Sequence, residues 1–261
     1  MNWEHAVSRD WLDARRNVIT ATELIGLISP FNGASKKAKA SGIIPAFAAL
    51  WAEKNSIHES DPMSYGPAAR GHIMEPFAVE EYNSNYYQNF YHWDDCIIKN
   101  KGVGFSPDAL DIEQPRDSVE LFVDHGKLTD GKSVYEMPKS LLEIKSYNPG
   151  HHYQNMLANK MAAQLNPERR QIAAAMLTLP SIEVGTLVQY CPQAPHAMFR
   201  KMFSREELAD DIELLDAVLS EWNKTCRYME TLAPEVYNMK YTEADIYKMY
   251  LMDKSVDVFA M

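Results

Sequence analysis

Cysteine is scarce in this sequence, and the three that are present lie far apart. Cys96, Cys191 and Cys226 form no C-x-x-C pair. Closely spaced cysteine pairs are typical of zinc ribbons, cysteine-bound clusters and disulfide frameworks. The sequence therefore argues against all three kinds of site.

Long apolar runs and an excess of positive charge are also missing. The longest apolar stretch, GIIPAFAALWA at 42–52, is too short to span a bilayer and contains a proline. The opening residues, MNWEHAVSRDW, lack the apolar segment of a signal peptide. We therefore expect a cytoplasmic protein with no membrane partner. The net charge of −10 disfavours a nonspecific nucleic-acid coat, but it permits an enzyme with a local basic groove and an acidic metal site.

The remaining composition is that of an ordinary globular protein, with 46% hydrophobic and 24% charged residues in 261. No internal repeat or clean linker divides the chain, so we expect one domain over residues 1–261. Thr20 and Glu23 form a capping-box pattern at the start of a helix within 18–28. Further helices are expected at 4–16, 45–54, 67–86, 150–165, 167–177 and 204–232, with a partly helical tail to 261. Strands are expected near 95–99, 102–106, 119–123, 133–136, 141–145 and 182–190.

The stretch KSLLEIKSYNP at 139–149 places a carboxylate and an ammonium two residues apart in a short apolar strand. Because side chains alternate along a strand, Glu143 and Lys145 share one face, and Leu142 and Ile144 share the other. The apolar pair can anchor the strand in a core while the charged pair serves a site. An edge strand with a solvated face is the alternative interpretation of this stretch alone.

Three acidic residues can form a metal site around this strand. Asp108 ends a preceding strand, Glu143 lies mid-strand, and Glu75 lies on the earlier helix. Magnesium prefers oxygen ligands, commonly one or two carboxylates together with water and substrate phosphate. The main-chain carbonyl of Ile144 can add another oxygen. Lys145 would then orient or deprotonate an attacking water, or neutralise charge on phosphorus.

Pro107-Asp108 followed by Glu143-Ile144-Lys145 matches the signature of the PD-(D/E)XK nuclease superfamily. The stretches WLDARRNVITATE (11–23), GFSPDAL (104–110) and LLEIKSYNP (141–149), with the Glu75 helix and a later glutamine-bearing helix, occur in a characteristic order. In this order the chain resembles the lambda exonuclease and YqaJ-like viral recombinase family over roughly residues 8 to 195. The resemblance implies an α/β fold with a restriction-endonuclease-like core, that is, a mixed central β-sheet flanked by α-helices.

The resemblance also assigns roles to individual residues. Asp108 and Glu143 match the metal-binding carboxylates, Lys145 the catalytic lysine, and Glu75 a further active-site acid. Gln171 best matches the family's active-site glutamine, with Gln154 and Gln164 as rivals. Arg15 matches an arginine that grips a 5′-terminal phosphate, assisted by a hydroxyl at the position of Thr22. The first turn of a capped helix independently favours phosphate at Thr22.

The function implied is a Mg²⁺-dependent 5′–3′ exonuclease acting on double-stranded DNA ends, with Mn²⁺ as a substitute metal, which leaves 3′ single strands. The resemblance further implies phage or prophage recombination in a bacterial host, a single-strand annealing protein as partner, and a ring-shaped homotrimer. An endonuclease or junction-cleaving enzyme on the same core is the nearest alternative. A non-catalytic DNA-end-binding protein is the alternative from another class.

One departure from the family is the long segment at 111–140 between Asp108 and the LLEIK strand. It is acidic and rich in turn residues, which predicts an extra hairpin rather than a second metal site. His151 and His152 follow the strand and could approach phosphate or metal. We expect them instead to be surface residues at the start of a helix.

Overall fold

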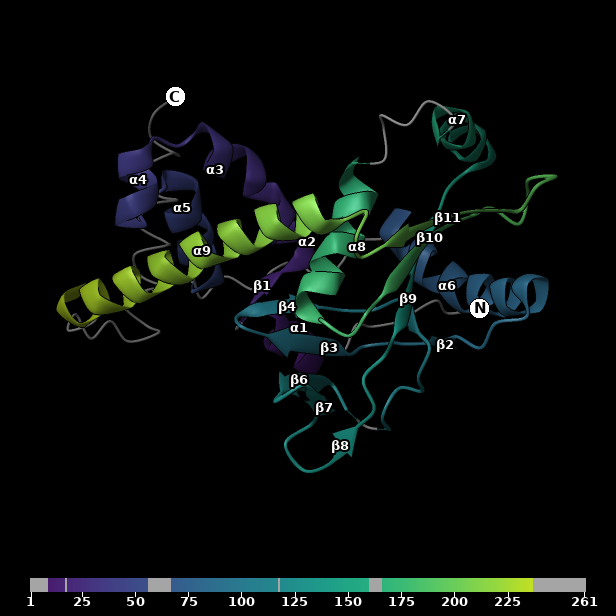
Figure 1. Cartoon of the computed structure of the whole chain (residues 1–261), viewed down its shortest axis with the longest axis horizontal. Coiled ribbons are helices and arrows are strands. Elements are labelled where there is room, and N and C mark those ends of the chain that lie inside the picture. The colour runs from purple at the N-terminus through teal and green to yellow at the C-terminus, as the bar shows by residue number, and fades with distance from the viewer. Residues whose placement is uncertain (1–8, 17, 56–66, 117, 160–165, 237–261) are drawn as a thin grey trace, which may run out of the picture.

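The computed structural model describes residues 9–16, 18–55, 67–116, 118–159 and 166–236 (Figure 1). Its helices are α1 (Arg9–Arg16), α2 (Ala21–Gly26), α3 (Ile28–Gly33), α4 (Lys36–Ser41), α5 (Pro45–Lys54), α6 (Pro67–Tyr86), α7 (Pro149–Asn159), α8 (Asn166–Thr178) and α9 (Ala209–Val236). Its strands are β1 (Ile19–Thr20), β2 (Tyr91–His92), β3 (Ile97–Asn100), β4 (Val103–Phe105), β5 (Ala109–Leu110), β6 (Glu120–Asp124), β7 (Lys127–Thr129), β8 (Val134–Tyr135), β9 (Ser140–Ser146), β10 (Val184–Tyr190) and β11 (Met198–Ser204).

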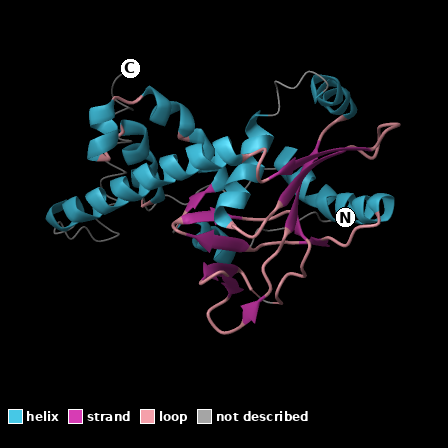
Figure 2. Cartoon of the chain, in the orientation of Figure 1, coloured by secondary structure: helices cyan, strands magenta, loops and turns pink. Residues whose placement is uncertain are grey.

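The strands of the described residues form two mixed sheets (Figure 2). A six-stranded sheet has the order β1-β4-β3-β6-β7-β8, and a five-stranded sheet has the order β11-β10-β9-β5-β2. Parallel pairs occur in both, between β1 and β4, β3 and β6, and β9 and β10. The predicted α/β fold with a mixed sheet flanked by helices is confirmed. The two sheets are joined where the chain passes from β4 through Asp108 into β5.

Helices cover both faces of the five-stranded sheet (Figure 1). Helix α8 lies against one face, where Ile172 and Met176 join Leu141 and Leu187 in the main core. The long helix α9 packs against α8, and its apolar side adds residues such as Leu215 to this core. Helix α6 lies on the opposite face and forms a second core with the alternate residues of β9 and β10. The alternation of side chains along β9 therefore directs Leu142 and Ile144 toward α6, and Glu143 and Lys145 toward the α8 side.

Most predicted elements are present with shifted ends. The capping box is confirmed, because the Thr20 N–H donates to Glu23 Oε2 at 2.7 Å and the Glu23 N–H donates to Thr20 Oγ1 at 3.4 Å. The helix predicted within 18–28 starts at Ala21, directly after its N-cap Thr20, and the preceding Ile19–Thr20 pairs with β4 as β1. Ile28–Gly33 forms the short helix α3, in a segment for which the sequence predicted no helix beyond residue 28.

Two further differences concern the second half of the chain. The helix predicted from 204 begins at Ala209, because Met198–Ser204 forms β11 beside β10. The 111–140 segment does contain a hairpin, β6–β7, but β6 pairs with β3 and β8 pairs with β7. The segment thus extends the six-stranded sheet. The predicted tail beyond 236 lies outside the described residues.

No helix in the described part of the chain combines the length and apolarity needed to cross a bilayer.

Gly185 of β10 lies directly against Ile172 of α8. A Cβ placed on this glycine would lie 2.2 Å from Ile172 Cγ2, well inside van der Waals contact. We expect Gly185→Ala to lower the free energy of unfolding by about 1–3 kcal/mol, because overpacking forces the helix off the sheet. Urea unfolding measures this change. Gly26→Ala is the matched control: it has open space around its Cβ and should gain up to about 1 kcal/mol. Equal stability of the two variants would contradict the packing argument.

Candidate active site

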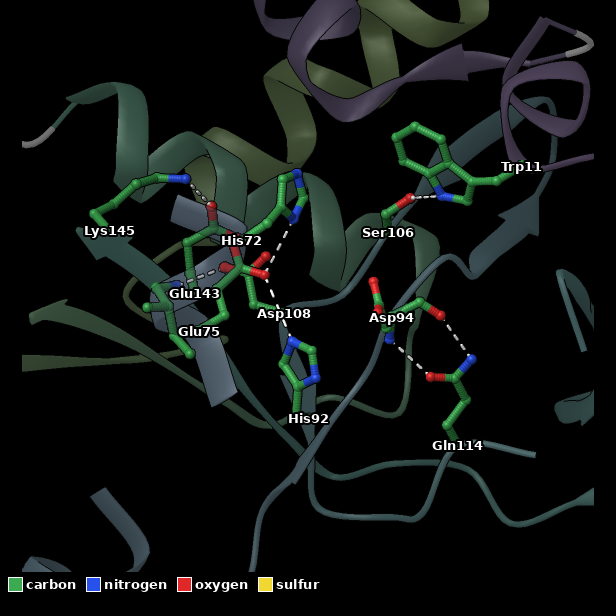
Figure 3. A network of polar contacts seen from close by, with 11 residues as sticks. Trp11, His72, Glu75, His92, Asp94, Ser106, Asp108, Gln114, Glu143 and Lys145 are labelled. Carbon is green, nitrogen blue, oxygen red and sulfur yellow. Dashed lines mark hydrogen bonds and ion pairs between the residues drawn. The ribbon is translucent and has the colours of Figure 1, made fainter. Parts of the chain in front are cut away.

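The predicted acids and lysine come together where β5 pairs with β9 in the five-stranded sheet (Figure 3). The antiparallel pairing sets Ala109 opposite Leu142, which places Asp108 beside Glu143. Glu143 is buried, at 5% exposure, between the apolar residues Leu142 and Ile144 of β9. Glu75 reaches the same place from α6 and is also buried, at 8% exposure. These three acidic residues, each at least 33 positions from the next in the sequence, thus form one cluster.

Asp108 is held by the strand that carries its partners. Its Oδ2 accepts a hydrogen bond from the Ile144 N–H at 2.6 Å. Desolvation raises the pKa of Asp108 well above its ordinary value, and the charges of Glu143 and Glu75 raise it further. Lys145 and the Ile144 N–H oppose this rise only in part. The carboxylates therefore repel one another in the absence of a compensating cation.

Lys145 supplies the positive charge that the cluster contains. Its Nζ lies 2.6 Å from Glu143 Oε1. Burial lowers the pKa of Lys145, but the charges of Glu143 and Asp108 outweigh it, so that the net shift is upward. In this arrangement Lys145 is a firmly protonated ammonium. It is suited to donating hydrogen bonds and stabilising negative charge rather than to accepting a proton.

Two histidines that the sequence analysis did not single out flank Glu75. The Nδ1 of His72 lies 3.4 Å from Glu75 Oε2, and the Nε2 of His92 lies 3.6 Å from the same oxygen. Desolvation raises the pKa of Glu75, but these two partners together lower it to about 2. The i, i+3 spacing of His72 and Glu75 on one helix was a sequence signal for this contact. Glu75 is therefore ionised.

The donor set fits a divalent cation by its chemistry. Asp108, Glu143 and Glu75 offer the carboxylate oxygens that Mg²⁺ prefers, and a cation would relieve their mutual repulsion. Within the described residues, however, no three Asp, Glu, His or Cys side chains are already arranged around a common point as a metal cluster. Each carboxylate is instead engaged by a neighbouring donor: Ile144 N–H, Lys145 or the histidines.

Of the two predicted phosphate residues, Arg15 on α1 is linked through Trp11 to the segment that precedes Asp108. The guanidinium of Arg15 stacks on Trp11, 4.3 Å from the ring centre, and the indole Nε1 of Trp11 donates to Ser106 Oγ at 3.3 Å. Ser106 is two residues before Asp108. Burial lowers the pKa of Arg15, and the charge of Glu23 opposes this shift.

Thr22 is exposed in the first turn of α2. The adjacent Glu23 is neutralised by Lys54, whose Nζ lies 2.9 Å from Glu23 Oε2. An anion beside Thr22 would therefore not face an unpaired carboxylate at Glu23.

The glutamines and histidines after β9 are separated by the fold. Gln171 is partly buried on α8, Gln154 is exposed on α7, and Gln164 lies outside the described residues. His151 is exposed, as expected. The expectation for His152 is wrong: it is fully buried, and its Nε2 lies 2.8 Å from the His196 carbonyl oxygen. His152 thus braces α7 against the segment before β11.

Three further polar groups next to Lys145 were missed. Tyr147 OH donates to Glu168 Oε1 at 3.2 Å, and desolvation and Glu168 raise the pKa of Tyr147 to about 12. Gln189 is fully buried in β10, directly opposite Lys145 in the parallel pairing. A glutamine within the apolar strand VGTLVQY was a sequence signal that could have drawn attention to it.

The fold, with two acids and a lysine at the junction of adjacent strands, is consistent with a restriction-endonuclease-like core. Solved structures with a similar fold include exonucleases. LHK-Exo, an alkaline exonuclease from Laribacter hongkongensis, superposes with a TM-score of 0.54 at 17% identity, covering 88% of this chain and 100% of its own. Its complex with dAMP gives 0.53 at the same identity and coverage. A phage-related exonuclease from Haemophilus somnus 129PT gives 0.53 at 13% identity, covering 81% of this chain and 96% of its own.

No protein-family model matches the sequence, and no curated protein resembles it significantly in sequence. The similarity to the solved exonucleases therefore lies in the fold. It agrees with the resemblance to the lambda exonuclease and YqaJ-like family that the motifs indicate.

Charge repulsion at Asp108 predicts a gain of stability when the charge is removed. A carboxyl whose pKa is raised by folding keeps its proton where the unfolded chain has lost it, so the folded state loses stability as the pH rises from the ordinary Asp value through the folded pKa. We expect Asp108→Asn to raise the Tm by a few degrees at neutral pH in chelator. The difference in Tm between the variant and the wild type should disappear in acid. Thermal melts over a pH series measure this.

Asp216→Asn, at an exposed position on α9, is the control and should leave the Tm unchanged. A lower Tm for Asp108→Asn than for the wild type at neutral pH would show that the carboxylate is stabilising. Mg²⁺ should raise the Tm of the wild type more than that of Asp108→Asn, because the variant lacks one proposed ligand.

Proposed function

We propose that this protein is a Mg²⁺-dependent nuclease of the lambda exonuclease and YqaJ-like family that degrades double-stranded DNA from its ends in the 5′ to 3′ direction. The observation that carries the proposal is the placement of Asp108, Glu143 and Lys145 at one strand junction. The shared fold with exonucleases supports the same reaction class.

Each residue of the cluster has a role in this proposal. Asp108, Glu143 and Glu75 would hold the cation, with the carbonyl of Ile144 as a further ligand. A bound Mg²⁺ would supply Lewis acidity and lower the pKa of a water molecule. Lys145, protonated beside Glu143, orients the attacking water by hydrogen bonding and stabilises the charge that develops on the phosphate. Gln171 is the proposed active-site glutamine on α8.

The direction of degradation depends on the residues before Asp108. Arg15, fixed by stacking on Trp11, would bind a 5′-terminal phosphate through charge-assisted hydrogen bonds, with the Thr22 hydroxyl assisting. If the 5′ end is bound next to the carboxylates, the strand that carries it is degraded. The complementary strand is then left as a 3′ single strand. Mn²⁺ should substitute for Mg²⁺, because it accepts the same oxygen ligands.

The proposal extends to the setting of the reaction through the family resemblance alone. It comprises phage or prophage recombination in a bacterial cytoplasm, a single-strand annealing protein that receives the 3′ strand, and a homotrimeric ring around the duplex. A ring would concentrate scattered basic residues along a channel despite the negative net charge.

Removal of the lysine tests the proposed reaction. We expect Lys145→Ala to slow cleavage of a 5′-phosphorylated duplex by about 10²–10⁴-fold while DNA-end binding, measured with Ca²⁺ in place of Mg²⁺, is retained. Lys139→Ala, at an exposed lysine just before the same strand, is the matched control with wild-type activity. Undiminished cleavage by Lys145→Ala would refute the role of Lys145. Cutting of a closed circular duplex by the wild type would refute an end-dependent enzyme in favour of an endonuclease.

The end pocket makes a separate prediction about substrate preference. We expect Arg15→Gln to reduce the preference for 5′-phosphate over 5′-hydroxyl ends by about 10–100-fold in kcat/KM, which is the worth of hydrogen bonds to a charged group. Arg116→Gln, at an exposed turn, serves as the control. An unchanged phosphate preference in Arg15→Gln would remove Arg15 from the pocket while leaving the cleavage mechanism intact.

A further inference from the structure

Gln189 is an unusual residue for the centre of a sheet. Its exposed fraction is 0%, and neither its Oε1 nor its Nε2 has a hydrogen-bond partner among the residues that the structure describes. Burying a primary amide without partners is destabilising, and such groups are rare in folded proteins. The neighbouring Leu187 and Val188 in the strand are apolar and fully buried. An apolar residue would therefore serve packing better at position 189.

The strand register identifies what lies beside this amide. Gln189 is opposite Lys145 of β9 on one side and opposite Phe199 of β11 on the other. Side chains at paired positions point to the same face, and neighbouring strands are about 4.8 Å apart. Phe199 offers no hydrogen-bonding group, whereas Lys145 ends in an ammonium with three donors. Of the two residues opposite Gln189 in the neighbouring strands, Lys145 is thus the polar one.

The present partner of Lys145 is a residue that the proposed function requires elsewhere. Its Nζ contacts Glu143 Oε1 at 2.6 Å, and Glu143 is a proposed cation ligand. If Glu143 turned its oxygens toward a cation, the ammonium of Lys145, whose side chain is 29% exposed, would lose its carboxylate acceptor. A half-buried ammonium without an acceptor is no longer held in one direction, so a replacement acceptor on the same face would keep it directed toward the site.

We propose that Gln189 is a positioning residue for Lys145, whose ammonium donates to Gln189 Oε1 in the cation-bound enzyme. This inference rests on the proposed function. It explains why an amide without partners is retained in an apolar strand: its cost in the resting protein is offset when Lys145 must be held toward the phosphate. Gln189 contacts neither DNA nor cation in this scheme and acts through Lys145.

Gln189→Met tests the proposal, because methionine keeps the linear shape but has no strong acceptor or donor. We expect kcat on a 5′-phosphorylated duplex with Mg²⁺ to fall by about 10–100-fold, the usual effect of losing a residue that orients a catalytic group. KM should stay unchanged. Gln189→Glu keeps an acceptor oxygen at the same reach and should restore most of kcat. Gln88→Leu, at an exposed turn after α6, is the control with wild-type kinetics.

Stability without cation gives a second, activity-independent readout. We expect the Tm of Gln189→Met in chelator to equal or exceed that of the wild type, because an amide without partners is removed. A glutamine with a structural role would give the opposite result, a clear fall in Tm.

The outcomes separate the inference from the proposed function. An active wild type with equally active Gln189→Met, or a Gln189→Met variant of lowered Tm, would overturn the positioning role alone. A wild type that cleaves no DNA under these conditions would overturn the proposed function and the inference with it. Lowered kcat, unchanged KM, maintained Tm and rescue by Gln189→Glu together support the proposal.

Discussion

Repulsion among like charges is the constraint around which this molecule is arranged. Asp108, Glu143 and Glu75 lie close enough for two of them to raise the pKa of the third, in surroundings that burial has made less polar. A fold would gain stability by separating such groups. In this protein they are instead held together by the Ile144 N–H, a lysine and two histidines. This combination is expected where a site is built to receive positive charge, and perturbed carboxyl groups cluster at such sites.

The scaffold fixes the cluster through rigid elements from several parts of the chain. Strand β9 carries two of its members and is enclosed by β10 and β5 within its sheet, with α8 and α6 on its faces. The passage from β4 to β5 then delivers Asp108 at the seam of the two sheets. The close contact of Gly185 with Ile172 sets how near α8 approaches this sheet. Few of these elements could shift without moving a charged group.

Local patterns in the sequence predicted much of this arrangement, and long-range pairing accounts for what was missed. The capping box at Thr20, the E-x-K strand and the α6 helix follow from short-range rules. The short strands β1, β2 and β5 carry too few residues to show periodicity, and they form only because a partner strand lies beside them. Glu75 and Asp108 could be predicted as members of one site by motif resemblance. The positions of His92 and Gln189 beside this site depend on strand register, which cannot be read from the sequence.

The indole of Trp11 ties the stacked Arg15 to Ser106, only two residues ahead of Asp108. Under the proposed function, this short connection fixes the distance between the bound 5′ phosphate and the phosphodiester that is cleaved. This distance would be the same in every catalytic cycle. The size of the released fragment would then be a property of the protein and not of the base sequence, so that successive turnovers yield uniform products.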